Sequence, residues 1–323
     1  ALPWPVDYRQ IYDIIQYAQK GAFFYGLDLK DCFSHWPLSP QTRRFFGVYD
    51  TLTDKVGMFT FLPQGLSPSP GVNDTFIKHC VTAVEHNHPN TAIFDFVDDI
   101  RGTARADPTD KTSVQQAMDD NVRVWEELGL RLHGRGNPEK WIDPTTRIRW
   151  IGYIIDTILQ QLELTPETIE KTLSKLEEAN KKYLKGLPIL AKELASLVGS
   201  MNWCALVVLV GKQYISPLEQ ALVKAEVYTK WANLHKLFNP LIAFPEDWET
   251  IHSFWTTVLN NKPALPINNI DGHPFIWSSN YLARFPDLIE KLNGHISVLT
   301  TDACEYGWGA TINNDHSQGS YDV

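Results

Sequence analysis

Aspartates stand at the ends of apolar strand patterns, and this feature most constrains how the chain can fold. A first apolar run, residues 22–29, contains Asp28 near its end, and a second, residues 91–101, carries Asp98 and Asp99 between two short apolar halves. A carboxylate beside a buried strand is unfavourable unless it binds something. The second run is typical of a β-hairpin with its carboxylates at the turn. We therefore predict neighbouring strands that bring the three carboxylates together, where two divalent cations would lie about 3.5–4 Å apart.

An Asp-Asp pair also has a plainer interpretation, because such pairs commonly do no more than cap a hairpin turn. The order of the surrounding segments has to decide between the two. The first half of the chain alternates helix and strand patterns, and Gly129 is a stop signal after its longest helix. The expected helices span 8–19, 71–85 and 110–128, and the expected strands span 22–29, 44–49, 56–61 and 150–155.

The composition changes after residue 156, where helical periodicity takes over. Thr165 followed by Pro166 is an N-cap and first-turn signal, and two amphipathic helices follow. One face of the first helix carries three lysines, Lys171, Lys175 and Lys182. A new strand pattern begins near residue 296, with 308–312 as its hairpin partner. The predicted units are a mixed α/β unit over 1–157, a helical unit over 158–240, a connector over 241–295 and the start of a further domain over 296–323.

Charge and cysteine usage limit the classes of function. The chain has 29 Lys plus Arg against 38 Asp plus Glu, a net charge of −9, which argues against nucleic-acid binding unless the charges are segregated. The four cysteines are far apart and form no metal-binding pair, which fits a reducing compartment. No signal peptide or apolar run of the ~20 residues needed to span a membrane is present. We expect a soluble intracellular protein, cytoplasmic or nuclear, without a membrane partner.

Five short segments share one order with a known family. They are Gly26 to Phe33 (GLDLKDCF), Leu62 to Pro70 (LPQGLSPSP), Phe96 to Asp99 (FVDD), Asn137 to Lys140 (NPEK) and Trp150 to Tyr153 (WIGY). Each resembles a motif of reverse transcriptases: the first catalytic motif, the Leu-Pro-Gln-Gly motif, the aromatic-x-Asp-Asp box, the lysine-bearing motif and the primer grip. One such segment is a weak signal, but the ordered set is specific.

The resemblance continues beyond these motifs. Residues 187–203 are similar to a thumb helix of retrotransposon enzymes, and residues 299–310 resemble the opening of their ribonuclease H domain. Together with the FVDD box, this segment points to retroelements of the long-terminal-repeat and DIRS (tyrosine-recombinase) type. The resemblance implies an α+β, right-hand polymerase: fingers and palm with an antiparallel sheet over 1–157, a helical thumb over 158–240, a connector over 241–295, and the truncated start of a ribonuclease-H-like α/β domain over 296–323.

The resemblance also assigns roles around the metals. Asp28 and Asp98 would ligate two Mg²⁺ ions, with Mn²⁺ as a substitute, and Leu29 would add its backbone carbonyl. Asp99 would be a nearby, more loosely engaged carboxylate. Lys140 would protonate or neutralise the departing pyrophosphate, although a solvated surface lysine is an equally simple interpretation.

Other residues would bind the nucleotide. Phe33 would lie beneath the incoming sugar and exclude a 2′-hydroxyl, thereby selecting dNTPs. Gln64 and Gly65 would contact the dNTP or template, since glycine permits close backbone approach. Arg43 and Arg44 would meet phosphates, or else are simply solvated.

The primer end would be held by Trp150, Ile151, Gly152 and Tyr153 through backbone contacts and stacking, and the alternative is a core strand with a buried Trp. Of the ribonuclease H carboxylates only Asp302 occurs in the sequence. One Asp cannot hold two metal ions, so we expect no RNA cleavage by this chain alone.

The sequence thus predicts a reverse transcriptase that adds dNTPs to a primer 3′ end on an RNA or DNA template. Its partners would be the RNA template, a DNA primer or RNA–DNA hybrid, dNTPs, and other chains or domains of the same polyprotein. The alternative is a domesticated, catalytically idle copy that serves as a scaffold or RNA-binding subunit, as the acidic charge would suggest. The intact carboxylates favour the enzyme, since drift would erode them in an idle copy.

Overall fold

The computed structural model describes residues 11–66, 68–208, 210–232, 237–270, 273–274, 299–304, 307–312 and 315–320. The chain divides into two compact units, residues 1–275 and 276–323. Within the described ranges, none of the helices is both long and apolar enough to cross a membrane.

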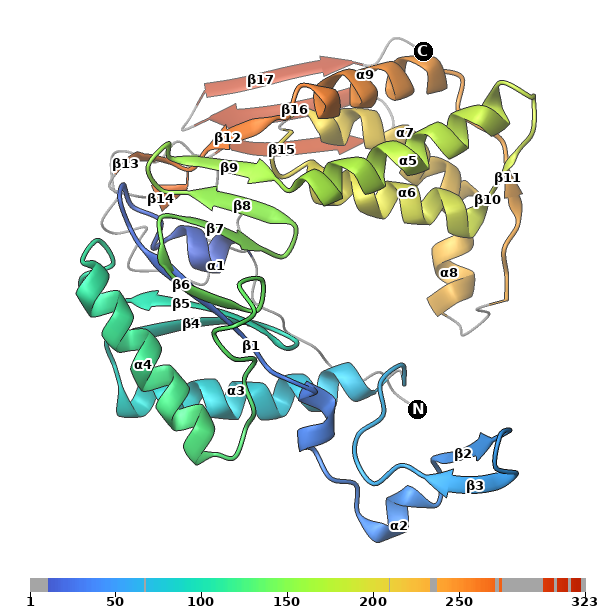
Figure 1. The fold of residues 1–323 in the computed structure, drawn as a ribbon. Helices are drawn as coiled ribbons and strands as arrows, with labels where there is room; N and C mark the ends of the chain where they lie inside the picture. Colours follow the sequence, from blue (N-terminus) through green and yellow to red (C-terminus); the bar gives the residue numbers. More distant parts are fainter. Residues whose placement is uncertain are drawn as a thin grey trace. The chain divides into compact units, whose positions relative to one another are not determined.

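Helices and strands alternate through the first unit (Figure 1). The helices are α1 (Ile11–Ile15), the 3-10 helix η1 (Cys32–His35), α2 (Pro40–Arg43), α3 (Ser69–Asn87), α4 (Lys111–Glu127), α5 (Pro166–Tyr183), α6 (Ala191–Cys204), α7 (Gly211–Lys224), α8 (Val227–Ala232) and α9 (Trp248–Asn260). The strands are β1 (Phe24–Asp28), β2 (Gly47–Asp50), β3 (Lys55–Met58), β4 (Thr91–Phe96), β5 (Asp99–Ala104), β6 (Trp141–Thr145), β7 (Arg147–Trp150), β8 (Tyr153–Asp156), β9 (Gln161–Leu164), β10 (Ile189–Leu190), β11 (Leu241–Ile242), β12 (Ala264–Pro266), β13 (Asn268–Ile270) and β14 (His273–Pro274).

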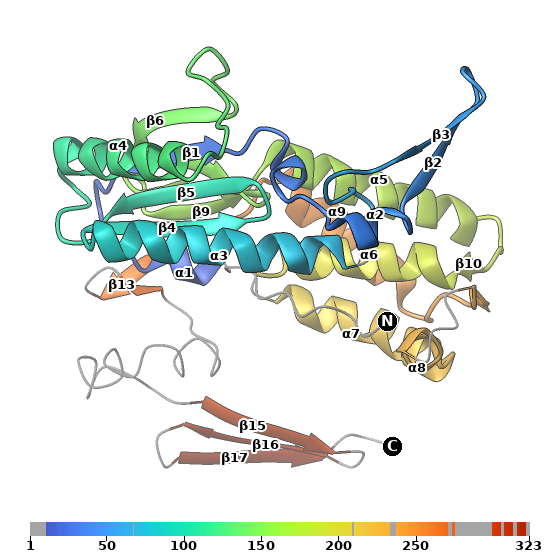
Figure 2. The same cartoon turned by 90° about the horizontal axis from the view of Figure 1, so that it is seen from below.

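A four-stranded antiparallel sheet in the order β4-β5-β1-β6 carries the aspartates. Helices α3 and α4 run along one of its faces (Figures 1 and 2). Alternation along β1 turns Tyr25 and Leu27 into the core beneath these helices and Phe24 into a second core on the other face. Asp28 therefore lies on the face that the helices leave open. The predicted strand 22–29 and the predicted hairpin at residues 91–101 are confirmed.

A second antiparallel sheet, β12-β9-β8-β7, packs on the open face of the first. The single strand expected over residues 150–155 is wrong, because the chain turns back within it. Trp150 ends β7 and Tyr153 begins β8, and the two residues between them, Ile151 and Gly152, both have positive φ angles, 41° and 86°. Two-residue hairpins need this backbone conformation. The run of apolar residues hid the turn, since Ile rarely adopts it.

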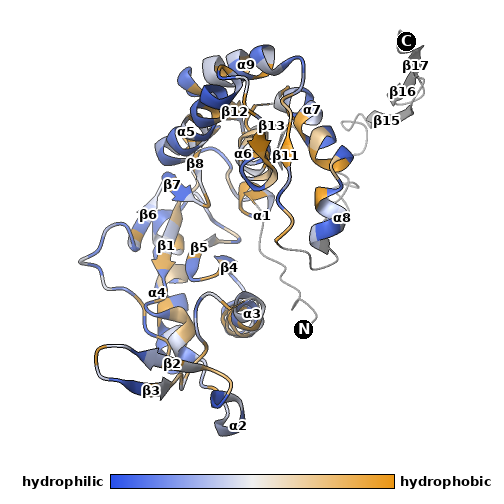
Figure 3. Cartoon of the chain, turned by 90° about the vertical axis from the view of Figure 1, so that its right-hand side faces the viewer, coloured by the Kyte–Doolittle hydropathy of each residue, from blue (hydrophilic) through white to orange (hydrophobic). Residues whose placement is uncertain are grey.

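The helical part begins as the sequence predicts. Thr165 caps α5 by accepting a hydrogen bond from the Thr168 amide at 3.3 Å, and Pro166 occupies the first turn. Helix α6 packs between α5 and α7. The exposed face of α5 is largely hydrophilic (Figure 3), as expected for a helix with one buried stripe.

Of the residues expected as a connector, 241–295, the described stretch 241–270 belongs to the first unit. Helix α9 packs against α5 and α7, and β12 pairs with β9 at the edge of the second sheet. The helix buries a stripe at spacings of three, four and four residues, Trp248, Ile251, Trp255 and Leu259. This stretch therefore adds to the core of the first unit.

The second unit contains three described strands, β15 (Leu299–Cys304), β16 (Gly307–Ile312) and β17 (Asp315–Ser320), in an antiparallel meander. The hairpin predicted from the residues around 299 and 308–312 is confirmed, with Asp302 opposite Gly309. Residues 295–298 of the expected strand lie outside the described residues. Strand β17 was not predicted.

The contact between β1 and β5 predicts a strict requirement for glycine. A Cβ atom at Gly102 would lie 2.3 Å from the ring of Tyr25, whose hydroxyl is bonded to the buried Asn121 and so cannot move aside freely. Gly102→Ala should lower the free energy of unfolding by about 1–3 kcal/mol through overpacking. Gly136→Ala, where a Cβ meets nothing within 4 Å, is the control. Equal denaturation midpoints for both variants would contradict this packing.

Candidate active site

The strand register brings the first two carboxylates together. Asp28 ends β1 and lies directly opposite Asp99, the first residue of β5. Residues opposite each other in antiparallel strands share one face. Asp28 is almost completely buried, whereas Asp99 is half-buried. The register thus places Asp28 and Asp99 side by side.

Asp98 reaches the same place through the turn of the β4–β5 hairpin. Its backbone carbonyl accepts a hydrogen bond of 2.9 Å from the Leu29 amide, which ties the turn to the residue after Asp28. Val97, just before it, has a φ of 62°, an unfavourable conformation for a β-branched residue that is typical of functional turns. Burial and the negative charge of Asp28 raise the pKa of the Asp98 carboxyl.

Two cationic or protonatable groups face Asp28. The Lys140 ammonium is ion-paired to one carboxylate oxygen, and this hydrogen bond raises the pKa of Lys140. His133 Nε2 lies 3.4 Å from the other oxygen, and its backbone amide donates to the Asp28 carbonyl at 3.0 Å. Lys140 is thus partly exposed, with its side chain 42% accessible, and is paired with Asp28. Sequence reasoning missed His133, since nothing in its loop marks it.

Asp99 has a cationic partner of its own, which sequence reasoning also missed. Arg101 is buried in β5, two residues further along and on the same face, and its guanidinium is ion-paired to the Asp99 carboxylate. Its Nε donates to the Arg149 carbonyl in β7 at 2.8 Å. A Cβ at Gly26 would lie 3.1 Å from this guanidinium. A sequence pattern could have indicated this pair. Arg101 stands in an apolar strand two residues after Asp99, so the two side chains lie on the same face of the sheet.

Burial raises the pKa of the Asp99 carboxyl, and the Arg101 guanidinium opposes that rise. Asp99 is therefore ion-paired to a side chain of the protein, whereas Asp98 is not bonded to a cationic side chain among the described residues.

The predicted nucleotide-binding residues lie on the segments that flank this sheet. Phe33 is half-buried in η1, four residues beyond Leu29, and Gln64 and Gly65 are exposed just before α3, with Gly65 at a φ of 85°. Arg43 donates to the Leu38 carbonyl at 2.9 Å, and Arg44 lies over the ring of Phe45. Both arginines are thus partly occupied by local contacts.

The predicted primer grip is divided by the β7–β8 turn. Trp150 and Tyr153 are buried in the core, so their rings are not free to stack on bases, and the core interpretation holds for these two side chains. The turn residues Ile151 and Gly152 are half-buried. A contact with a primer would come from this turn alone.

The turn also anchors the thumb helices. The Gly152 carbonyl accepts hydrogen bonds from the Thr165 amide at 3.0 Å and from the Thr168 hydroxyl at 3.1 Å. The Tyr153 hydroxyl donates to the Trp203 carbonyl of α6 at 2.6 Å. A Cβ at residue 152 would lie 2.9 Å from both Thr168 and the Trp203 indole. Glycine is required there for space as well as for φ.

The lysine face of α5 is partly used inside the thumb. Lys175 donates to Ser200 and to the Ser196 carbonyl on α6, and Lys182 is ion-paired to Glu193. Among the described residues Lys171 makes no side-chain hydrogen bond or ion pair, and it is exposed. Two of the three lysines therefore hold α5 against α6.

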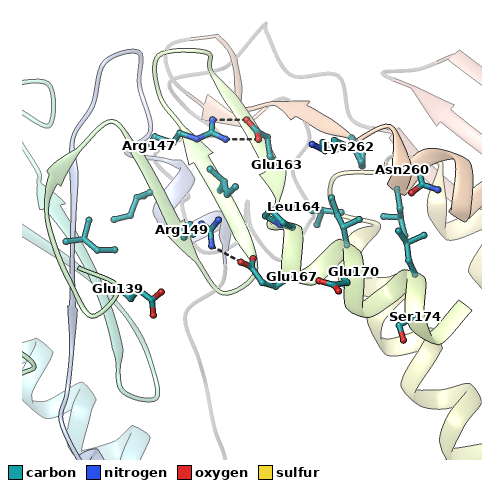
Figure 4. A pocket seen from close by; sticks show the side chains of 18 of the residues that line it. Glu139, Arg147, Arg149, Glu163, Leu164, Glu167, Glu170, Ser174, Asn260 and Lys262 are labelled. Carbon is teal, nitrogen blue, oxygen red and sulfur yellow. Dashed lines mark hydrogen bonds and ion pairs between the residues drawn. The ribbon is translucent and has the colours of Figure 1, made fainter. Parts of the chain in front are cut away.

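A groove of about 1380 Å³ lies between the second sheet and α5 (Figure 4). Arg147 makes two parallel bonds to Glu163, and Arg149 is paired with Glu167 at 3.0 Å. Arg101 is among the lining residues, whereas the three aspartates are not among the described residues that line it. The groove is therefore separate from the carboxylate cluster.

The donor set fits magnesium with help from a substrate. Among the described residues, no three His, Cys, Asp or Glu side chains are gathered as a metal cage. Mg²⁺ is commonly held by one or two carboxylates together with substrate phosphates and water. Asp28 and Asp98, close enough that one raises the pKa of the other, match that pattern. In the second unit Asp302 lies in β15.

The architecture and its site define a class. An antiparallel sheet with helices on one face, carboxylates at a hairpin turn and an attached helical part form the right-hand polymerase fold of reverse transcriptases. The chain aligns over 98% of its length with a foamy viral protease-reverse transcriptase in complex with an RNA/DNA hybrid, at 16% identity and a TM-score of 0.56, covering 36% of that chain. A complex of the foamy viral protease-reverse transcriptase with dsDNA matches at 14% identity and a TM-score of 0.55, covering 56% of that chain.

Sequence similarity points the same way. The chain is 28% identical over 225 residues to the Gag-Pol polyprotein of baboon endogenous virus (strain M7), and 26% identical over 219 residues to the Pol polyprotein of feline endogenous virus ECE1. These matches cover 67% and 65% of this chain but only 12% and 18% of the polyproteins. No family model matches. The similarities support a reverse transcriptase of retroelement origin.

The ion pair of the half-buried Asp99 with the buried Arg101 predicts an asymmetric response to mutation. Arg101→Met should cost about 3 kcal/mol of unfolding free energy, because it leaves a carboxylate without its cation inside the protein. The double variant with Asp99→Asn should recover part of that loss, since no uncompensated charge is left. Urea denaturation measures both.

The control for this pair is Arg105→Met. Arg105 is ion-paired to Glu85 at 2.6 Å with its side chain 40% exposed, and such pairs contribute only about 0.2–1 kcal/mol. Additive losses for Asp99→Asn and Arg101→Met would show that the two side chains do not act as a pair.

Proposed function

We propose that this chain is the polymerase part of a retroelement reverse transcriptase, which adds dNTPs to a primer 3′ end on an RNA or DNA template. The observation that carries the proposal is the placement of Asp98 beside Asp28, fixed by the β1–β5 register and by the bond from Leu29 to the Asp98 carbonyl. Two carboxylates held together against their own repulsion are typical of a site for divalent cations.

The metal would be Mg²⁺, with Mn²⁺ as a substitute, held as two ions by the Asp28 and Asp98 carboxylates and the Leu29 carbonyl. When bound, such ions lower the pKa of a primer 3′-hydroxyl and stabilise the charge on the leaving pyrophosphate. Asp99, which is ion-paired to Arg101, contributes negative charge from its position opposite Asp28 in the sheet.

The protein's own groups complete the site. Lys140, which neutralises Asp28 here, neutralises or protonates the pyrophosphate as it leaves. Phe33 bounds the space for the sugar, and Gln64, Gly65, Arg43 and Arg44 serve the nucleotide or the template. The turn of Ile151 and Gly152 holds the primer end through its backbone.

The proposed partners are an RNA template, a DNA primer or RNA–DNA hybrid, and dNTPs. Support comes from the fold shared with foamy viral enzymes in complex with RNA/DNA hybrid and dsDNA. Other parts of the same polyprotein are further partners, because the relatives are polyproteins of much greater length. Within the retroelements we propose the long-terminal-repeat or DIRS-like type, on the FVDD box and the segment around Asp302.

The metal assignment predicts two linked losses in Asp98→Asn. Primer extension should fall by about 10³-fold, since an interaction worth several kcal/mol to the transition state is removed. The variant should also lose the rise in melting temperature that Mg²⁺ gives the wild type, because a ligand that binds only the folded state stabilises it. Asp28→Asn should behave in the same way.

The control is Asp119→Asn, which removes the same charge from an exposed site on α4. It should keep both extension and the Mg²⁺ effect. Near-normal extension by Asp98→Asn at the same Mg²⁺ concentration would refute the metal site, and a wild type that binds primer–template without extending it would favour the idle scaffold.

The sugar gate predicts a change in selectivity. Phe33→Val should raise the use of CTP relative to dCTP by about 10- to 100-fold and leave dCTP use much less changed, because exclusion acts only on the bulkier substrate. Incorporation efficiencies for the two nucleotides measure the effect, with the melting temperature taken in parallel. Phe23→Val, at a partly buried residue directly before β1, should cost stability without changing the ratio. A stability loss with an unchanged ratio in Phe33→Val would place the gate elsewhere.

A further inference from the structure

Asn73 lies in the second turn of α3 with its side chain completely buried. Its amide makes three hydrogen bonds. Nδ2 donates to the Val97 carbonyl at 3.1 Å, and Oδ1 accepts from the Trp36 indole N–H at 2.6 Å and from the Cys32 thiol at 3.1 Å. A buried amide is costly unless it is bonded, and here both of its polar atoms are in use.

The three partners belong to the two segments that carry the proposed chemistry. Val97 directly precedes Asp98 and adopts the unfavourable φ of 62°. Cys32 and Trp36 stand on either side of Phe33, at the start of η1 and just after its end. One side chain on α3 therefore joins the turn of the metal carboxylate to the turn of the sugar gate.

The partners also dictate the residue type. An indole N–H can only donate and a backbone carbonyl can only accept, so the side chain between them needs an acceptor on one side and a donor on the other. The indole donor and the carbonyl acceptor also fix which side of the amide carries Oδ1 and which carries Nδ2. A leucine has about the same size as asparagine, but its side chain can neither donate nor accept a hydrogen bond. The buried network is fully satisfied, and such networks make their surroundings rigid.

Packing around the amide reinforces the link. Trp36 stacks on Phe76 of α3, with the ring centroids 4.5 Å apart and the planes at 11°. The Cys32 sulfur lies 3.7 Å from the Val97 carbonyl oxygen, as a second and weaker contact between the two turns. The η1 segment is thus held to α3 by an aromatic stack as well as by Asn73.

We propose that Asn73 is a positioning residue that sets the place of Asp98 and the sugar selectivity of Phe33 together, by clamping both turns to α3. The inference rests on the proposed polymerase function and deepens it. Misplacing a reacting group by about 1 Å can cost about 100-fold in rate, so loss of the clamp reduces the rate of dCTP incorporation and weakens the exclusion of CTP in one variant.

The experiment compares Asn73→Leu with Asn121→Leu. Asn121 is equally buried but donates to the Tyr25 hydroxyl in the core beneath the sheet. Asn73→Leu should lower kcat for dCTP by about 10- to 100-fold and lower the dCTP-to-CTP preference. Asn121→Leu should lose stability and keep the preference. Equal kcat and equal preference in the two variants would overturn the proposal.

Trp36→Phe provides a second variant, which keeps a six-membered aromatic ring for the stack on Phe76 and removes the indole N–H together with the rest of the five-membered ring. It should lower the preference while reducing kcat less than Asn73→Leu does. If Asn73→Leu does not fold, an unchanged preference in Trp36→Phe is the result that sinks the clamp.

The clamp is also measurable without catalysis, which separates it from the proposed function. The losses of melting temperature in Asn73→Leu and Trp36→Phe should be less than additive in the double variant, since both remove one shared bond. Fully additive losses would overturn the clamp. A wild type that extends no primer would overturn the polymerase proposal, while this measurement would still decide the clamp.

Discussion

The repulsion between neighbouring carboxylates is the constraint on which the rest of the site depends. The β1–β5 register places Asp28 opposite Asp99, and the hairpin turn adds Asp98. The protein meets this charge with Lys140 on Asp28 and Arg101 on Asp99. Burial and the charge of Asp28 raise the pKa of Asp98, and Asp98 makes no ion pair with a cationic side chain among the described residues.

The unfavourable turns are held by contacts from elsewhere in the chain. Val97 is fixed by the Asn73 amide, and the turn of Ile151 and Gly152 is fixed by Thr165 and Thr168 at the start of α5. Strained backbone persists only where its surroundings determine it strongly. Each of these turns therefore depends on a helix that the chain places against it.

The two sheets are joined through the same residues that control charge. Arg101 pairs with Asp99 in the first sheet and donates to the Arg149 carbonyl in the second, and Gly26 leaves room for its guanidinium. The second sheet in turn holds the thumb helices through Gly152 and Tyr153. A chain of bonds thus leads from the carboxylates to α5 and α6.

The sequence by itself determined the strands that carry the aspartates, the N-cap of α5 and the motif order, because these depend on local periodicity and on residue types with strong local preferences. It did not determine the turn inside residues 150–155, the folding of residues 241–270 into the core, or the partners of the carboxylates. His133 and Asn73 act on residues that lie between 24 and 105 positions away in the sequence. Only the tertiary structure decided these contacts, since burial and strand register place side chains together that no local pattern connects.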